Sequence, residues 1–407
     1  MTYTDQLTAA RTTPRPKVLI SGAGIAGPVL AFWLNRYGYA VTMVEKAGAP
    51  RSGGYPVDVR GTALEVVRRM GILPRLREAH VDLRRLTFLE GDGREVTSLH
   101  PHSVTGGVEG RDLEVRRGDL TDALHTTVRD DLEFVFNDSI DTLDQSGHGV
   151  DVTFRGGGRR TFDLVFGADG MHSRTRDMVF GPEEQFHHYL GYCFAVFTMR
   201  NTLGLSHESV MWNSPGRAAA LYAVGDDEVH AFLNFAQPRL PFDAFTDPQA
   251  QRDLVATAFA DAGWEVPGML AALRDADDVF FDAVSQIRMP RWSHGRVALV
   301  GDAAWAPSFL TGQGTSLALV GAYMLAGSLA GRDHAAGFAA YERSTRDFVT
   351  TNQALVGNGS ATLFPTTPQA LAERNDRLRA IDAVPSGEGR PAHSALTLPD
   401  FTPMTRT

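Results

Sequence analysis

The chain of 407 residues has almost no cysteine and no long apolar run. Its single cysteine, Cys193, excludes an intrachain disulfide, fits a reducing compartment, and is expected to be a small core residue. No run of about 18 apolar residues is present, which predicts that no helix spans a membrane. His80, His100, His102 and His172 show no metal-ligand spacing, so no metal site is expected.

Positive charge is also scarce. Lys and Arg number 39 against 48 Asp and Glu, and the formal net charge of −9 argues against a nucleic-acid partner. Residues 1–16 are polar and lack the apolar stretch of a signal peptide, which predicts a disordered lead and a cytoplasmic protein. The hydrophobic fraction of 43% and the charged fraction of 21% are typical of a globular protein, long enough for two or three domains or one domain with a large insertion.

A glycine-rich turn near the start of the chain is the strongest motif. Residues 17–45 have the pattern strand, turn, helix, strand, and the turn contains Gly22, Gly24 and Gly27 as G-x-G-x-x-G. The first glycine permits the turn, the second lets backbone amides approach a pyrophosphate, and the third allows close helix–strand packing. Glu45 lies 18 residues beyond Gly27, where a carboxylate can accept hydrogen bonds from a ribose. This pattern predicts a dinucleotide site; the alternative is a tight turn that binds nothing.

The secondary structure indicated by the rest of the sequence changes twice along the chain. Before residue 185, further strands are expected at 85–99 (a hairpin), 133–136, 149–154 and 161–166. Aromatic-rich runs at 191–200, 207–213, 217–223 and 228–235, then helices at 248–262 and 267–274, predict an inserted domain on an antiparallel sheet. Residues 313–331 are apolar or small on nearly every face, which predicts a buried helix, and 335–356 predict an amphipathic one.

Two later segments narrow the class of dinucleotide. One is a strand that delivers Asp169-Gly170, and the other is a strand that delivers Gly301-Asp302, followed by Gly312-Gln-Gly314 and the buried helix. With the glycine turn, these motifs resemble the FAD-dependent aromatic hydroxylases of the para-hydroxybenzoate hydroxylase type, the group A flavoprotein monooxygenases. The resemblance covers roughly residues 17–357 and is greatest to the shorter, antibiotic-tailoring branch that includes the tetracycline-inactivating monooxygenase.

The resemblance implies an α/β fold with a Rossmann-like FAD-binding domain (GR2-type), an inserted α+β substrate domain built on an antiparallel sheet, and C-terminal helices. The expected boundaries are a disordered lead at 1–16, an FAD-binding domain at 17–84, 105–184 and 283–335, a substrate domain at 85–104 and 185–282, a C-terminal helix at 336–360, and a C-terminal extension at 361–407.

The resemblance also implies roles for matching positions. The glycine turn and Glu45 would hold the ADP half of a tightly bound FAD, with Lys46 along the adenosine. Arg117 would reach toward the FAD chain, Asp169 would lie near the pyrophosphate, and Asp302 would hydrogen-bond a ribityl hydroxyl. The start of the buried helix would face the flavin pyrimidine edge, where its dipole favours negative charge. The expected FAD-binding set is Gly22, Gly24, Ile25, Ala26, Gly27, Glu45, Lys46, Arg117, Asp169, Asp302, Gly312, Gly314 and Thr315. Without the resemblance, Asp169 and Asp302 would be interpreted as turn or cap residues at strand ends.

The implied activity is hydroxylation of a polycyclic aromatic or polyketide-like compound through a flavin C4a-hydroperoxide, after reduction by transiently bound NADPH or NADH. One departure favours an alternative. The family usually has a proline over the flavin, whereas this chain has Phe309 there and Pro307 two positions early; Ser316 and Gly321 replace the family's later Asn and Asp. A bulky ring would fill the space for oxygen chemistry, so the alternative is a non-redox cyclase with FAD as part of the pocket wall. The third hypothesis is a flavin-binding protein without enzymatic activity.

We expect a hydrophobic small-molecule substrate between the flavin and the aromatic-rich sheet. The candidate contacts are Tyr192, Phe194, Met211, Trp212, Tyr222, Phe232, Asn234 and Phe309. Alternate residues on a strand share a face, so Tyr192, Phe194 and Val196 are expected on one wall, although strand aromatics also pack in cores by default. A second candidate wall consists of Val57, Asp58 and Arg60. The sequence indicates no catalytic residue and no oligomeric state.

Overall fold

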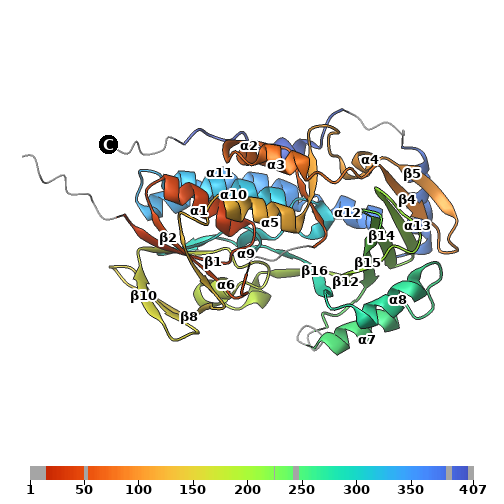
Figure 1. The fold of residues 1–407 in the computed structure, drawn as a ribbon, viewed down its shortest axis with the longest axis horizontal. Helices are drawn as coiled ribbons and strands as arrows, with labels where there is room; N and C mark the ends of the chain where they lie inside the picture. Colours follow the sequence, from red (N-terminus) through yellow and green to blue (C-terminus); the bar gives the residue numbers. More distant parts are fainter. Residues whose placement is uncertain (1–14, 50–53, 224, 242–246, 382–386, 402–407) are drawn as a thin grey trace, which may run out of the picture.

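The computed structural model describes residues 15–49, 54–223, 225–241, 247–381 and 387–401. The expected disordered lead lies outside these residues except for its last two positions. The molecule is elongated, with a helix-covered six-stranded sheet toward one end and a seven-stranded sheet toward the other (Figure 1).

The six-stranded sheet is built around β1 (Lys17–Ser21), which pairs in parallel with β2 (Ala40–Glu45) and β11 (Leu164–Gly167). Helix α1 (Ala26–Arg36) connects β1 to β2, which confirms the predicted strand–helix–strand unit. The full order is β17-β18-β11-β1-β2-β7. The edge strands are β7 (Glu133–Phe136) and the antiparallel β17 (Ser293–His294), and β18 (Val297–Leu299) lies between β17 and β11.

Both faces of this sheet are covered, as the continuous apolar sequence of β1 requires. Val18 and Ile20 pack on one side with helices α1, α10 (Gly314–Leu329) and α11 (His334–Gln353). Leu19 packs on the other side with a three-stranded sheet of β8 (Ile140–Gln145), β9 (Val150–Phe154) and β10 (Arg159–Phe162). Every residue of α10 after Gly314 is buried, so the predicted buried helix is confirmed.

The seven-stranded sheet has the order β16-β12-β15-β14-β13-β4-β5, and only β13 and β4 are parallel neighbours among its described strands. Its members are β4 (Arg85–Leu89), β5 (Glu95–Leu99), β12 (His187–Arg200), β13 (Glu208–Ser214), β14 (Arg217–Ala223), β15 (Glu228–Ala236) and β16 (Phe280–Ile287). Helices α7 (Pro248–Ala258) and α8 (Val266–Asp275) cover one face, which confirms the predicted sheet-based insert.

Shorter elements join these two parts. A two-stranded ribbon, β3 (Pro56–Val59) with β6 (Leu113–Arg116), lies between them. The remaining α-helices are α2 (Thr62–Arg69), α3 (Leu73–Glu78), α4 (Pro101–Thr105), α5 (Arg117–Thr126), α6 (Arg174–Phe180), α9 (Asp302–Trp305), α12 (Val356–Leu363) and α13 (Pro368–Arg379).

Three local expectations were wrong. The single strand expected at 161–166 is the end of β10 and the start of β11, in different sheets, with Asp163 between them accepting a 2.7 Å hydrogen bond from the Lys17 backbone N–H. Strands β8 and β16 were not expected, and β16 crosses the expected boundary between residues 282 and 283. Residues 336–360 contain parts of two helices, α11 and α12.

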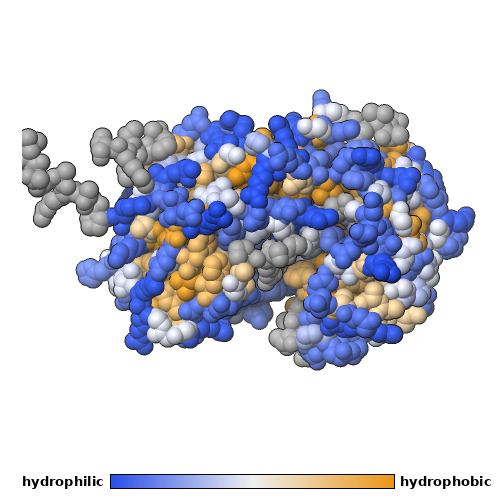
Figure 2. Space-filling view, viewed as in Figure 1, coloured by the Kyte–Doolittle hydropathy of each residue, from blue (hydrophilic) through white to orange (hydrophobic). Residues whose placement is uncertain are grey.

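Within the described ranges, no helix is long and apolar enough to cross a membrane. On the face seen in Figure 2, hydrophilic residues predominate and the apolar residues form separate patches.

Candidate functional site

In the glycine turn after β1, two of the glycines are packed closely against backbone atoms and the third borders open space. A Cβ on Gly22, whose φ is +103°, would lie 2.5 Å from the Ala168 carbonyl oxygen, and a Cβ on Gly27 would lie 2.0 Å from the Gly22 oxygen. A Cβ on Gly24 would meet nothing within 4 Å. Gly22 and Gly27 are therefore required by packing, whereas Gly24 leaves the backbone open on one side. Helix α1 begins there without a side-chain cap and without an acidic residue in its first turn, which suits an anion.

The Glu45 carboxylate orders this turn from the end of β2. It accepts hydrogen bonds from the backbone N–H groups of Ala23 (2.8 Å) and Ala47 (3.0 Å). The buried ring of His125, on α5, contacts the Ala23 carbonyl through Nε2 at 2.7 Å. Lys46 is exposed. His125 was missed by the sequence analysis, because no motif links it to the turn.

The second motif meets the first directly. The position of a Cβ on Gly22 lies 2.9 Å from the Asp169 Cα. The Asp169 carboxylate accepts hydrogen bonds from the Ser173 hydroxyl (2.5 Å) and from the Thr175 N–H (3.0 Å) and hydroxyl (2.8 Å). The Asp169 side chain thus caps the turn that starts α6, which is the turn-or-cap role expected of it from its position at a strand end. Its backbone adjoins the glycine turn.

The third motif also reaches the first. Gly301, at φ +66°, is so close to α1 that a Cβ there would lie 3.0 Å from the Ala26 Cβ. Burial raises the pKa of Asp302, and the positive charge of Arg117 opposes that rise. A Cβ on Gly314 would lie 4.0 Å from Asp302 Oδ1, so this carboxylate faces the start of α10. The three turns predicted to share one cofactor therefore converge.

Two buried glutamines fix the loop between Asp302 and α10. The Gln353 amide, from α11, donates to the carbonyls of Ile287 (2.9 Å), Trp305 (3.2 Å) and Ala306 (3.3 Å). The Gln286 amide, from β16, donates to the Pro307 carbonyl at 2.9 Å. Helix α10 starts after this loop with no side-chain cap and no acid in its first turn, which contains Gly314 and Thr315, and Gly312 lies just before the helix. Neither glutamine belongs to a motif, and both were missed.

The face of the seven-stranded sheet opposite α7 and α8 is called here the near face. Strand register places Phe194 opposite Asn234 and Tyr222 opposite His230 on it, and Phe232 and Met211 share it because both are partners of Ala220. Tyr192 shares the face and its hydroxyl donates to the Phe364 carbonyl at 3.4 Å. Met211 packs on it with a separate apolar cluster of β4, β5 and α13.

Trp212 is the predicted substrate contact that the structure does not bring to the near face. It is a register partner of Ala219 and is buried in the core under α7 and α8. Its indole N–H donates to the Gly91 carbonyl at 3.0 Å. The alternation along β13 separates Met211 from Trp212, so the two residues could not both face a ligand.

Phe309 belongs to an aromatic cluster between the near face and the loop before α10. Its ring centroid lies 4.8 Å from that of Phe194 and 6.1 Å from that of Phe364, and Phe194 also contacts Phe280 at 5.7 Å. Phe309 remains 39% exposed, although large aromatic residues are usually more buried. An accessible ring at this place provides a flat apolar surface.

The β3–β6 ribbon contributes a charged group to the same region. Asp58 forms an ion pair with the buried Arg60, and a Cβ on Gly312 would lie 3.0 Å from Asp58 Oδ2. Glu114, opposite Asp58 on β6, was missed by the sequence analysis. Burial and the Asp58 charge raise the pKa of Glu114 to about 8.

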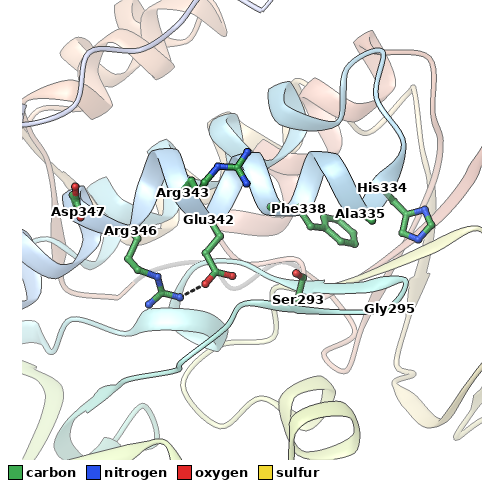
Figure 3. A pocket seen from close by; sticks show the side chains of 10 residues that line it. Ser293, Gly295, His334, Ala335, Phe338, Glu342, Arg343, Arg346 and Asp347 are labelled. Carbon is green, nitrogen blue, oxygen red and sulfur yellow. Dashed lines mark hydrogen bonds and ion pairs between the residues drawn. The ribbon is translucent and has the colours of Figure 1, made fainter.

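A groove of about 580 Å³ elsewhere contains none of the predicted site residues. It lies between α11 and the β17 region and is lined by Ser293, His334, Phe338, Arg343 and their neighbours (Figure 3). Arg346 at this groove is paired with Glu342. Within the described part of the chain, no group of three or more His, Cys, Asp and Glu residues is arranged to hold a metal ion.

Comparison with known proteins agrees with this geometry. Residues 15–354 match the family described as an FAD binding domain. The chain is 44% identical over 345 residues to an uncharacterized protein of Mycobacterium tuberculosis, covering 84% of this chain and 92% of that protein. It is 36% identical over 388 residues to a flavin-dependent monooxygenase from an unknown prokaryotic organism, covering 95% and 99%. The crystal structure of the tetracycline destructase Tet(55) matches with a TM-score of 0.81 at 35% identity, covering 95% and 99%.

The converging turns, the open Gly24 and the two uncapped helix starts fit FAD, and together with these matches they define a flavoprotein whose cofactor is FAD. The chain belongs to the FAD-dependent group A flavoprotein monooxygenase family, as its motifs predicted.

Proposed function

We propose that this chain uses NAD(P)H and oxygen to hydroxylate a planar polycyclic substrate of aromatic or polyketide type. The observation that carries the proposal is the aromatic cluster of Phe194, Phe309 and Phe364, which joins the near face to the loop before α10. A flat apolar ligand placed there would lie beside the start of α10. The likeness to Tet(55), a tetracycline destructase by name, supports a polycyclic substrate.

The chemistry places few demands on protein acids. Overall, a substrate C–H bond becomes C–OH and the second oxygen atom leaves as water, with NAD(P)H providing one hydride, which carries both electrons required, and solvent providing one proton. Bound FAD supplies the electron transfer and the oxygen activation. The glycine turn, Glu45, Arg117 and Asp302 would hold it, and the start of α10 would favour negative charge beside it. The apolar near face would exclude water and orient the ring to be attacked.

The test is consumption of NADPH, NADH and oxygen by the FAD-loaded protein with a panel of polycyclic phenols and ketones. We expect substrate-stimulated consumption of one nicotinamide and a product heavier by one oxygen atom. A flavin that stays oxidised with excess nicotinamide and every candidate would contradict the proposal. The preferred nicotinamide and the cytoplasmic location stay predictions.

A second function is favoured by one observation, the Phe309 ring in place of the family's proline. In that case the chain would be a non-redox cyclase of polyketide type, with FAD as part of the pocket wall. It would convert its substrate under nitrogen without NAD(P)H, to a product of unchanged elemental composition. Strict dependence on oxygen would dismiss this alternative.

A further inference from the structure

Two carboxyl groups lie side by side where the two parts of the molecule meet. Asp58 on β3 and Glu114 on β6 are direct cross-strand partners in the antiparallel ribbon, so their side chains project from the same face. Asp58 is close to Gly312, in the loop before α10. Glu114 is close to Tyr222, on the near face of the seven-stranded sheet. The pair thus joins the cofactor side of the site to the substrate side.

The charges around this pair decide where a proton resides. Arg60 is 5% exposed and pairs with Asp58; its backbone N–H donates to the Ser316 hydroxyl (3.1 Å) and its Nη1 to the Thr105 carbonyl (3.3 Å). The nearby Asp112 carboxylate is occupied by the backbone N–H groups of Gly61 (3.2 Å) and Val108 (2.8 Å). Arg60 is therefore in direct contact with Asp58, while its buried Nε has no hydrogen-bond partner among the described residues.

Glu114 forms no ion pair of its own with any described residue, although the charge of Arg60 acts on it. Its backbone, but not its carboxyl group, interacts with the His80 ring at 3.0–3.2 Å. Burial raises the pKa of both carboxyl groups, Arg60 opposes the rise, and the Asp58 charge adds to it for Glu114, whose pKa reaches about 8. Because the guanidinium contacts Asp58, the shared proton belongs on Glu114 at neutral pH.

Tyr222 adds a second donor. Its buried hydroxyl is close enough to the Glu114 carboxyl group for the two side chains to interact, which raises the pKa of Tyr222 and opposes the rise at Glu114, but the hydroxyl forms no hydrogen bond of good geometry with any described residue. Buried hydroxyl groups are nearly always hydrogen-bonded, so an unsatisfied one at a binding face indicates a missing partner. A protonated carboxyl group and a neighbouring hydroxyl without a well-aligned partner together suit an electron-rich oxygen atom.

We propose that Glu114 and Tyr222 recognise an enol or phenol oxygen of the substrate, with Glu114 donating its proton in a hydrogen bond and the Asp58–Arg60 pair keeping that proton on Glu114. This assignment rests on the proposed function, because it names the oxygen substituent of the same polycyclic substrate. Glu114 acts as a specificity-determining residue and no bond to carbon is made or broken by it.

The test measures binding to the FAD-loaded protein without any nicotinamide. The probes are alizarin, a dihydroxyanthraquinone whose colour reports its ionisation, and anthraquinone, which lacks the hydroxyl groups. We expect Glu114→Leu to weaken alizarin binding about 3- to 10-fold, the loss of one hydrogen bond, and to leave anthraquinone binding unchanged. Tyr222→Phe should have a smaller effect of the same selectivity, and Glu228→Leu, an exposed position on β15, should have none.

Glu114→Gln provides the matched control, because its amide is a neutral donor at every pH. We expect wild-type affinity for alizarin to fall as the pH rises through about 8, relative to the Gln variant, which removes the ligand's own ionisation from the comparison. Equal alizarin affinity of the wild-type protein and the Leu variant, including no binding to either, would overturn the assignment. Loss of FAD rather than alizarin in both variants would also overturn it. Selective binding without NAD(P)H-dependent turnover would instead reject the proposed function and leave the recognition site standing.

Discussion

The fully buried guanidinium of Arg176 donates a 3.1 Å hydrogen bond to the backbone carbonyl of Ala303. Arg176 lies on α6, just beyond the Asp169 turn, and Ala303 directly follows Asp302 in α9. The same guanidinium donates to the Met171 carbonyl at 2.7 Å and pairs with Glu183. One side chain therefore fixes the second and third cofactor turns relative to each other.

Replacing this side chain should loosen both turns. In Arg176→Met, the Ala303 and Met171 carbonyls and the Glu183 carboxylate lose a charged donor in a buried place. Removing one partner of a buried pair commonly lowers the free energy of unfolding by about 3–5 kcal/mol. We expect a loss of this size in the free energy of unfolding, measured in urea, and a larger FAD dissociation constant, measured by flavin fluorescence. Arg174→Met, at the exposed position two residues earlier, is the control; equal effects of the two would contradict the role given to Arg176.

The three cofactor turns could be predicted because each depends on neighbours in sequence. Gly22 and Gly27 stand where a side chain would collide with backbone only two to three ångströms away, and such constraints leave a recognisable spacing. The alternation of β13 was visible too, but which face of the strand meets the cofactor was not. Trp212 was therefore placed at the substrate, whereas it lies in the core under α7 and α8.

The supports of the site could not be predicted because they act across long sequence separations. Gln353 holds carbonyls 47 and 48 residues away, and His125 contacts a carbonyl 102 residues away. A glutamine or histidine on a helix has no spacing that marks such a partner. Glu114 gained its properties only through pairing of β3 with β6, which brings it opposite Asp58.

Gln353 should matter for stability more than its chemistry suggests. In Gln353→Leu, carbonyls of Ile287, Trp305 and Ala306 lose a shared buried donor. Unsatisfied buried groups lower stability by about 1–3 kcal/mol each, and this one amide serves all three. We expect a fall of roughly 2 kcal/mol or more in the free energy of unfolding and broader flavin absorbance bands. Gln369→Leu, an exposed glutamine on α13, should be neutral, and a neutral Gln353→Leu would show that the loop is held by other contacts.

Phe309 should contribute to binding of flat ligands. Its ring is 39% exposed and rests on Phe194 at 4.8 Å. Aromatic pairs contribute about 0.5–1.5 kcal/mol beyond area burial, so Phe309→Ala should weaken anthraquinone binding roughly 2- to 10-fold. Isothermal calorimetry of the FAD-loaded protein measures this. Leu203→Ala removes another apolar side chain of similar exposure, 41%, and should leave affinity unchanged. Tighter binding by Phe309→Ala would show that the ring obstructs the site instead.

His172 should make stability depend on pH. Its Nδ1 lies 2.8 Å from Glu183 and its Nε2 lies 3.3 Å from Asp282 on β16, and these two carboxylates raise the pKa of His172 to about 10. A raised pKa means that the stabilisation is complete below the unfolded value near 6.5 and is lost as the pH rises through about 10. Thermal unfolding of His172→Gln should therefore show a deficit at pH 6 that shrinks toward pH 10. His148→Gln, at an exposed turn, should show no such trend. A deficit that grows with pH would be the wrong sign.

Glu114 should give a pH dependence of the same sign, because its pKa is also raised in the folded protein. Its pKa rises from 4.5 in the unfolded chain to about 8 in the folded protein, so the folded protein binds more protons than the unfolded chain between these values. Stability contributed by Glu114 is complete below pH 4.5 and is lost as the pH rises through about 8. Relative to wild type, Glu114→Gln should become more stable over this window, by on the order of 1 kcal/mol for each pKa unit. Urea unfolding of FAD-saturated protein at several pH values measures this difference. A constant difference between the two proteins would mean that Glu114 is ionised in the folded state, and that Asp58 rather than Glu114 holds the proton.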